Sequence, residues 1–276
     1  MTEQPNDSTD PAESTTPGST PEPTPEPTPG STPEATPETI PGPTPEAATE
    51  PCPGPLPVLR QEEDFLAVSK PSGLLVHRDK NYPDAHAALQ IVRDQIGQYV
   101  YPFHRLDRAT SGILMFGLSS ESAAALQKSL SAPDAHKDYM ALMRYPGSNK
   151  ELGASWTMDR PLTDDKDIAR ECRSDFEVVE TFSRCALVRC RIFTGRYHQI
   201  RRHANHAGRH VIGDTTHGKG RINATFRKLY GLHRLFLHLQ RVEMAHPSTG
   251  ERFVLEDPMP EELTSVLDRL RAVADS

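Results

Sequence analysis

One carboxylate in this sequence stands between two arginines at the entrance to an apolar segment. Asp107 lies between Arg105 and Arg108, and the apolar run Gly112–Leu118 follows it. A carboxylate in a solvated turn would explain this pattern, because Asp is common in turns. The alternative is a carboxylate kept ionised by guanidinium groups for chemistry on an anionic substrate. This segment alone does not choose between the two interpretations.

A second basic segment lies far along the chain, at residues 194–210. It contains four arginines and four histidines, Arg196, Arg201, Arg202, Arg209, His198, His203, His206 and His210. A solvated basic helix face is one interpretation of this segment. His203 and His206 lie one helical turn apart, as metal ligands can, but no Cys or carboxylate joins them at ligand spacing. The sequence therefore predicts no metal site here.

The beginning of the chain differs in composition from the rest. Residues 1–57 contain 17 of the 26 prolines, ten acidic residues and no Lys, Arg or His. Such a segment buries too little to offset its ordering entropy, so residues 1–55 are predicted to be a disordered, acidic arm rich in Pro, Thr and Glu. The arm has neither the basic start nor the apolar run of a signal peptide. No segment approaches the roughly 18 apolar residues of a membrane span.

The remaining residues, 56–276, have the length of one large domain with a core. The chain has a net charge of −7, and without the ten acidic residues of the arm it has 31 basic against 28 acidic residues, a balance of +3. A mildly basic domain is compatible with a polyanionic partner. Because no CxxC pair occurs, the cysteines are predicted to be reduced thiols of a cytoplasmic protein: Cys52, Cys172, Cys185 and Cys190.

Strand and helix patterns alternate in this domain without a regular βαβ order. Apolar runs predict strands on either side of a turn at residues 70–73, and at 112–118, 137–145, 175–182, 185–193, 235–244 and 251–256. Helical spacing predicts helices at 84–97, 119–130 and 195–208 and from 260 onward, with Asp84 and Ser119 or Ser120 as N-caps. The Gly-rich region 213–231 is predicted to be a loop. The fold class is therefore α+β, with one sheet.

Three separated motifs together resemble the RluA-type family of pseudouridine synthases. They are KPSG at residues 70–73, HRLDRATSG at 104–112 and TGRYHQIRRH at 194–203, and the resemblance extends over roughly residues 58–257. It implies the pseudouridine synthase fold, a mixed and mostly antiparallel sheet with flanking helices. It also implies an isomerase that converts uridine to pseudouridine in RNA, with no metal or organic cofactor.

The resemblance assigns three catalytic residues: Asp107 as the catalytic carboxylate, Arg201 as its partner and Tyr139 as the active-site tyrosine. A planar guanidinium suits a carboxylate, and its charge opposes the rise in pKa that a dry pocket causes. The tyrosine ring can stack on a flipped uracil, and its hydroxyl could help remove the C5 proton. An ordinary core tyrosine is the alternative for Tyr139. Whether Asp107 attacks C6, attacks C1′ or assists a glycal route stays open.

A further set of basic residues is predicted to bind the RNA. In the family the arginine that matches Arg105 helps to hold RNA around a flipped base, and Lys70 would line the pocket or contact a phosphate. The predicted set is Arg105, Lys70, Arg196, Arg202, His203, Lys219 and Arg221. An ordinary turn residue is the alternative for Lys70, and an ordinary solvated loop is the alternative for Lys219 and Arg221.

Within the family, the segments 92–112, 117–122 and 212–221 look most like the branch of tRNA pseudouridine synthase C. That resemblance implies tRNA as the substrate and uridine 65, in the T-stem beside the acceptor stem, as the target. One alternative is a pseudouridine synthase acting on 23S or other ribosomal RNA. A non-catalytic RNA-binding protein is the other, although it would not need Asp107, Tyr139 and Arg201 together. We expect a cytoplasmic monomer with no membrane association and no obligatory protein partner.

Overall fold

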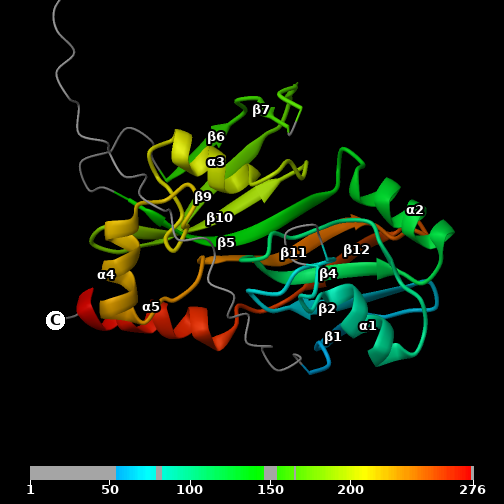
Figure 1. The fold of residues 1–276 in the computed structure, drawn as a ribbon. Coiled ribbons are helices and arrows are strands. Elements are labelled where there is room, and N and C mark those ends of the chain that lie inside the picture. The colour runs from blue at the N-terminus through cyan, green and yellow to red at the C-terminus, as the bar shows by residue number, and fades with distance from the viewer. Residues whose placement is uncertain (1–53, 79–82, 146–153, 165, 275–276) are drawn as a thin grey trace, which may run out of the picture. The chain divides into compact units, whose positions relative to one another are not determined.

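A ten-stranded sheet forms the centre of the described part of the chain (Figure 1). The computed structural model describes residues 54–78, 83–145, 154–164 and 166–274, so the predicted arm lies outside it except for residues 54 and 55. The strand order is β1-β2-β4-β11-β5-β10-β9-β6, with β3 paired to β4 and β12 paired to β11. Only the pairing of β4 with β11 is parallel in this sheet. The mixed, mostly antiparallel sheet is thus confirmed.

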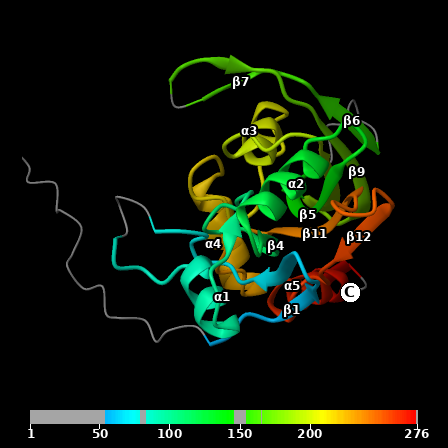
Figure 2. The same cartoon turned by 90° about the vertical axis from the view of Figure 1, so that its right-hand side faces the viewer.

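The strands of the sheet are β1 (Val58–Gln61), β2 (Phe65–Lys70), β3 (Tyr101–Pro102), β4 (Ser111–Gly117), β5 (His136–Arg144), β6 (Ser155–Met158), β9 (Ser174–Thr181), β10 (Cys185–Ile192), β11 (Leu237–Ala245) and β12 (Arg252–Glu256). A separate two-stranded ribbon contains β7 (Leu162–Thr163) and β8 (Ala169–Arg170), and it extends past the third helix (Figure 2). The helices are α1 (Ala88–Ile96), α2 (Ser120–Leu130), α3 (Gln199–His206), α4 (Gly220–Tyr230) and α5 (Glu261–Ala274).

The first two helices begin in different ways. Helix α2 starts with a capping box in which Ser119 and Ser122 each bind the other's backbone N–H, as the cap prediction at Ser119 expected. Helix α1 does not begin at Asp84, and Ala87 is its N-cap residue. The N–H groups of Ala88 and Leu89 bind the carbonyls of Leu75 and Val76, at 2.8 and 3.0 Å. A side-chain cap is unnecessary there because tertiary carbonyls satisfy these donors.

The prediction of a loop over residues 213–231 is wrong for its second half, which forms α4. The residues Ile222, Phe226 and Tyr230 are spaced by four, and all three pack on one hydrophobic cluster. Gly231 ends the helix in the left-handed conformation, at φ 67°. Gly220 and Gly231 therefore mark the two ends of a helix. Its apolar stripe was missed because basic residues lie between the apolar ones in the sequence.

Two hydrophobic clusters occupy opposite faces of β5 and β10. On β5, Tyr139, Ala141 and Met143 belong to the cluster beneath α1, α2 and α3, while Met140 and Leu142 belong to the cluster beneath α4 and α5. This alternation follows the two-residue period of a strand. Figure 1 shows α3 on one side of these strands and α4 with α5 on the other. Both faces are therefore covered, which explains why β5 is buried along most of its length.

Residue 112 is a point where the parallel pairing leaves no room for a side chain. Gly112 has φ 120° and pairs with Leu239 of β11, and a Cβ at Gly112 would overlap the backbone of Leu239. The same pairing places the preceding segment, residues 103–110, at the end of β4. The site described below depends on this segment.

We expect Gly112→Ala to destabilise the protein by about 2–5 kcal/mol, through left-handed backbone strain together with overpacking. Gly250→Ala is the matched control: Gly250 has φ 74° but nothing within 4 Å of an added Cβ. The control should therefore cost only about 1–2 kcal/mol of strain. Urea unfolding of both variants measures the difference, and equal losses would contradict a steric role for the Leu239 backbone.

Candidate active site

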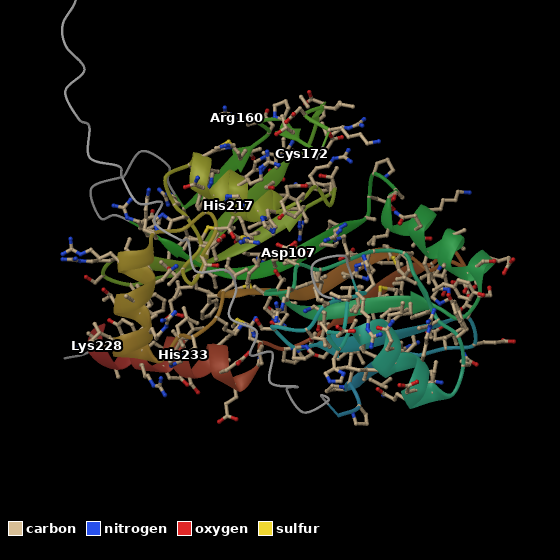
Figure 3. All side chains as sticks on the ribbon, in the orientation of Figure 1. Asp107, Arg160, Cys172, His217, Lys228 and His233 are labelled. Atoms are coloured by element: carbon tan, nitrogen blue, oxygen red, sulfur yellow. The ribbon has the colours of Figure 1, made fainter. Side chains whose placement is uncertain are left out.

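A cavity of about 270 Å³ opens beside the segment that contains Asp107. Its walls come from the segment before β4, from β5, and from the turn between β10 and α3. The volume lies near the lower end of the range for small-molecule pockets, about 300 Å³, so it suits a ligand of the size of one nucleobase. Figure 3 shows Asp107 close to the centre of the described structure, below α3.

Asp107 lies at this cavity against a guanidinium that two carboxylates share. Arg201 donates from Nη1 to Asp107 Oδ2 at 3.1 Å. Its Nε and Nη2 bind the two carboxylate oxygens of Asp214 at 2.7 and 2.8 Å, a bidentate pair. The predicted pairing of Asp107 with Arg201 is therefore present, but the planar fork of Arg201 faces Asp214. The sequence analysis did not single out Asp214, whose side chain has no exposed surface.

Burial and hydrogen bonding act in opposite directions on this ion pair. Burial alone would raise the pKa of Asp214, but hydrogen bonds from Arg201 and from the N–H groups of His217 and Thr216 lower it below its usual value. Burial likewise opposes the charge on Arg201, and the two carboxylates raise its pKa nonetheless. The guanidinium is thus held as a cation between Asp214 and Asp107, with a fixed orientation.

Two histidines extend the contacts of Asp107 at the same carboxylate oxygen. His198 Nε2 lies 3.6 Å from Asp107 Oδ2, and His198 Nδ1 lies 2.9 Å from His217 Nε2. Burial lowers the pKa of His198 to about 4, with Arg201 and His217 opposing its charge, so the ring is neutral near pH 7. The contact between His198 Nδ1 and His217 Nε2 is one hydrogen bond, in which one ring donates and the other accepts according to their tautomers. His217 therefore fixes the ring orientation of His198.

The turn before α3 holds His198 in an uncommon backbone conformation. His198 is the N-cap residue of α3 and has φ 52°, in the left-handed region. Gln199 stabilises the turn: its Oε1 accepts from Thr194 Oγ1 and from the Arg196 N–H, and its Nε2 donates to Arg173 O and Ser174 Oγ. Left-handed strain in a non-glycine residue persists only when the surroundings enforce it. Here Gln199 enforces it beside the cavity.

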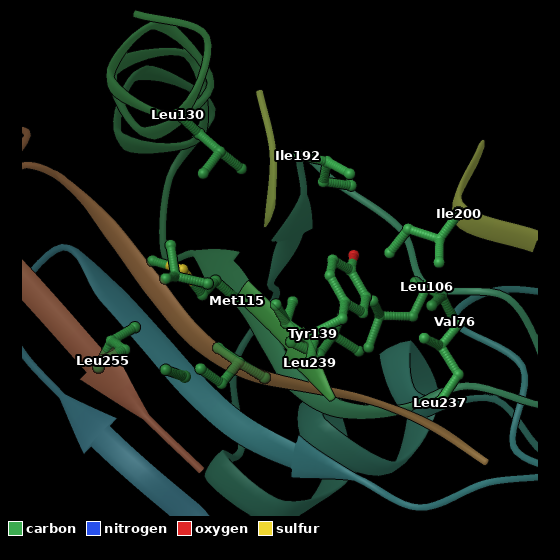
Figure 4. Packing of buried hydrophobic residues seen from close by; sticks show 14 of the residues in the cluster. Val76, Leu106, Met115, Leu130, Tyr139, Ile192, Ile200, Leu237, Leu239 and Leu255 are labelled. Atoms are coloured by element: carbon green, nitrogen blue, oxygen red, sulfur yellow. The ribbon is translucent and has the colours of Figure 1, made fainter. Parts of the chain in front are cut away.

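Tyr139 contributes a ring and a neutral hydroxyl to the cavity wall. Figure 4 shows its ring among buried apolar side chains, with the hydroxyl directed between Ile192 and Ile200. Burial raises the pKa of this hydroxyl well above its usual value, and the charges of Asp107 and Cys190 act in the same direction. The hydroxyl is therefore a hydrogen-bond donor and not a base at neutral pH. Tyr139 belongs to the core and to the cavity at once, so the two interpretations of this residue are compatible.

The KPSG turn anchors the backbone that follows Asp107. Lys70 has no exposed surface, and its Nζ donates to Pro71 O and Leu74 O at 2.8 Å and to Arg108 O at 3.3 Å. Ser72 Oγ donates to Ala109 O, at 2.7 Å. A buried Lys70 cannot contact RNA, so this part of the predicted RNA-binding set is corrected. Burial, with help from Arg234, lowers the pKa of Lys70 to about 7.

The polar side chains of His104 and Thr110, in the same segment, differ in whether they have a partner. His104 Nε2 accepts the N–H of Met115 in β4, at 2.9 Å, and burial lowers the pKa of His104 to about 3, so this ring is neutral. Thr110 is 2% exposed and lines the cavity, and its hydroxyl has no hydrogen-bond partner among the described residues. Buried hydroxyls are normally satisfied, so Thr110 offers a hydrogen bond to a ligand in the cavity.

The other predicted RNA-binding residues fall into three groups. Arg105 and Arg196 line the cavity and are exposed, as a contact with RNA requires. Arg202 binds the carbonyl and hydroxyl of Thr163 in the β7–β8 ribbon. Lys219 and Arg221 are exposed but do not line the Asp107 cavity.

His203 is the second residue of the predicted RNA-binding set that the structure corrects. It has no exposed surface, and its ring lies between Ser174 Oγ and Arg160 O, each 2.9 Å away. These two contacts use both ring nitrogens, so His203 joins α3 to the adjoining segments. Its helical spacing with His206 gave no sign of this burial.

The described residues contain no group of three His, Cys, Asp or Glu side chains that could hold a metal ion. Cys172, Cys185 and Cys190 are buried free thiols, while Cys52 lies outside the described ranges. None of the described helices is both long and apolar enough to cross a membrane.

Comparison with known proteins identifies the family. The family model described as RNA pseudouridylate synthase matches residues 64–206. The tRNA pseudouridine synthase C of Vibrio parahaemolyticus is 36% identical over 222 residues, which cover 72% of this chain and 88% of the relative. The tRNA pseudouridine synthase C of Yersinia pestis is 38% identical over 224 residues, which cover 72% of this chain and 84% of the relative.

Solved structures show the same fold. Human RNA Pseudouridylate Synthase Domain Containing 4 superposes with a TM-score of 0.64 at 20% identity, covering 78% of this chain and 93% of the human chain. Human RNA Pseudouridylate Synthase Domain Containing 1 gives a TM-score of 0.60 at 20% identity, covering 80% and 95%. The chain belongs to the RNA pseudouridylate synthase family, in the RluA-type group that its motifs predicted, and is an isomerase.

The pKa of Lys70 gives a pH-dependent contribution to stability. Because folding lowers this pKa from 10.5 to about 7, the unfolded chain holds more protons between these values, and folding becomes more favourable as the pH rises. Lys70→Met lacks this contribution. The wild-type free energy of unfolding should therefore rise relative to the variant by up to about 1.4 kcal/mol per pH unit from pH 7 to 9. Urea unfolding at pH 7, 8 and 9 measures this, and a constant difference would contradict it.

The contact between His217 and His198 should affect the rate more than RNA affinity. We expect His217→Ala to lower the single-turnover rate of uridine isomerisation by roughly tenfold, because His198 loses the partner that fixes its ring beside Asp107. His217→Gln keeps an amide donor and should retain more of the rate. The measurement uses saturating RNA, with affinity measured separately. A purely structural role would instead slow both variants equally.

Proposed function

We propose that this protein isomerises uridine to pseudouridine in tRNA, with Asp107 as the catalytic carboxylate and uridine 65 of the T-stem as the target. The observation that carries the proposal is the hydrogen bond from Arg201 to Asp107 at the wall of a cavity of nucleobase size. The reaction detaches uracil from ribose, turns it and rejoins it through C5. It requires neither a metal nor an organic cofactor.

Asp107 is the group that acts on the nucleotide. A carboxylate can form a covalent intermediate or stabilise positive charge only as an anion. Arg201 donates a hydrogen bond to this carboxylate, while Asp214 fixes the orientation of Arg201. Tyr139 stacks on the uracil ring and donates a hydrogen bond from its neutral hydroxyl. The hydroxyl of Thr110 binds a polar atom of the flipped nucleotide.

Exposed arginines at the cavity accept the RNA. A base inside a stem must leave the helix to reach Asp107, at a cost of a few kcal/mol. Arg105, two residues before Asp107, fills the space that the base vacates. Arg196, on the opposite wall, contacts a backbone phosphate, which positions the RNA without reading its sequence. These charges also offset the net negative charge of Asp107, Arg201 and Asp214 taken together.

Residues 56–276 carry out this reaction as a cytoplasmic monomer. The choice of tRNA rests on the two curated relatives described above, which are both tRNA pseudouridine synthases C. The arm, residues 1–55, has ten acidic residues and no basic residue, so its charge disfavours binding to RNA. The catalytic domain therefore provides target recognition.

Tritium release from tRNA labelled with [5-³H]uridine tests the reaction, because the new C5 bond displaces this hydrogen into water. We expect release by the wild type and at least about a thousandfold less by Asp107→Asn, which keeps the size of the side chain but lacks its charge. A tRNA in which cytidine replaces uridine 65 should no longer release the tritium that the wild-type tRNA releases from this position.

The controls separate the alternative functions. Circular dichroism and RNA affinity should be the same for Asp107→Asn and the wild type, so that the lost rate reports on chemistry. Release from ribosomal RNA fragments but not from tRNA would overturn the proposed substrate. Binding without release from either RNA would overturn the enzymatic proposal and leave an RNA-binding protein.

A further inference from the structure

A second cavity, which we call the arginine cavity, lies where α4 meets the turn between β9 and β10. Its volume is about 670 Å³, and it shares no lining residue with the Asp107 cavity. Three arginines line it, Arg144, Arg184 and Arg221, together with the hydroxyl-bearing Ser183 and Thr225 and the apolar Ile222 and Phe226. No carboxylate is among these residues. At the left of Figure 1, α4 stands beside the ends of the central strands.

The three arginines differ from those that lie nearby in the same sheet. Arg189 pairs with Glu177, and Arg191 pairs with Asp138, each within 3 Å. Within the described ranges, none of the three arginines of the cavity forms an ion pair, and the one side-chain hydrogen bond among them joins Arg144 to Gly208 O at 3.3 Å. Guanidinium groups gathered without counter-charges repel one another and create a positive potential. This arrangement fits a ligand with several anionic oxygens.

The arginine cavity is close to the Asp107 site along two stretches of chain. Arg221 follows His217 by four residues, so their Cα atoms are at most about 14 Å apart. Arg144 follows Tyr139 by five residues of β5, or about 17 Å, and lies at the end of the strand on its opposite face. Double-stranded nucleic acid carries about one phosphate charge per 1.7 Å of its axis. A stem whose nucleotide enters the Asp107 site therefore has phosphates at these distances.

The start of α4 adds positive potential to the same region. Lys219 is the N-cap residue of α4, and the first turn of this helix contains no acidic residue. The partial positive charge of the helix N-terminus is therefore not offset there. Burial mainly lowers the pKa of His210; the charges of Arg144 and Lys219 lower it further, and Asp214 opposes them. Lys219 and Arg144 thus both lie near His210.

We propose that the arginine cavity binds backbone phosphates of the substrate RNA away from the nucleotide that is modified. The contact raises affinity for the RNA and does not take part in the chemical step. Phosphodiester oxygens match three guanidinium groups and two hydroxyl groups, and such contacts carry no sequence information. This inference rests on the proposed RNA substrate and names a second surface that holds it.

The test removes two charges at the arginine cavity and two on the same helix outside it. Arg184→Gln/Arg221→Gln is the test variant, because both side chains are exposed and bind no described residue. Arg227→Gln/Lys228→Gln is the matched control, since both of its residues are exposed on α4 and neither lines the cavity; Lys228 is labelled in Figure 3. The two variants lose the same charge from the same part of the fold.

The measurement is the affinity for a full-length tRNA transcript between 50 and 300 mM salt, with single-turnover tritium release at saturating tRNA. We expect the test variant to bind about tenfold more weakly at the lower salt concentration. Its slope of log affinity against log salt should be shallower by about two, one for each phosphate that the variant no longer neutralises. Its rate at saturation should stay within about twofold of the wild type. The control should keep the wild-type slope.

Two results would overturn the inference while leaving the proposed function intact. One is an unchanged affinity and slope for the test variant, together with normal wild-type turnover. The other is an equal loss in the test and control variants, which would show a diffuse charge effect instead of a site. Absence of tritium release by the wild type would instead contradict the proposed function.

Discussion

The position of one guanidinium determines the geometry of the site. Arg201 uses Nε and Nη2 for Asp214 and has Nη1 left for Asp107. A buried ion pair such as Arg201–Asp214 often adds little net stability, because desolvation offsets its attraction. It does fix orientation, since a planar fork bound at two points cannot rotate. The third donor of Arg201 therefore points at the carboxylate of Asp107 without depending on the contact with Asp107.

The segment that bears Asp107 is held by three polar side chains. Lys70 and Ser72 bind the carbonyls that follow Asp107, and His104 binds the β4 backbone. Lys70 has no exposed surface, so each broken bond of its ammonium group would leave an unsatisfied polar atom at a cost of about 1–3 kcal/mol. Lys70, which the sequence predicted to bind RNA, thus serves to fix the loop that bears Asp107. Preorganisation of this kind places the carboxylate before the substrate arrives.

Much of the fold and the central pair of the site could be predicted from the sequence, because both depend on local patterns or on whole motifs. Ser119 or Ser120 was predicted as a cap, and Ser119 is the cap; the apolar run 112–118 predicted a strand, and β4 is buried along its whole length. Burial of single polar residues was not predictable: Lys70 and His203 have types common at surfaces, and only tertiary packing buries them. Asp214 was missed for the same reason, since nothing in its local sequence shows that Arg201 reaches it.

The parallel pairing of β4 with β11 has a consequence for how the enzyme is formed. It joins Ser111 to His238, 127 residues apart in the chain, and the contact of Asp107 with Arg201 spans 94. Contacts between such distant residues close large loops and slow folding. On a ribosome, the strand that completes this pairing, β11, emerges after both Asp107 and Arg201. A nascent chain therefore holds both partners of the Asp107–Arg201 contact before the sheet that positions Asp107 is complete.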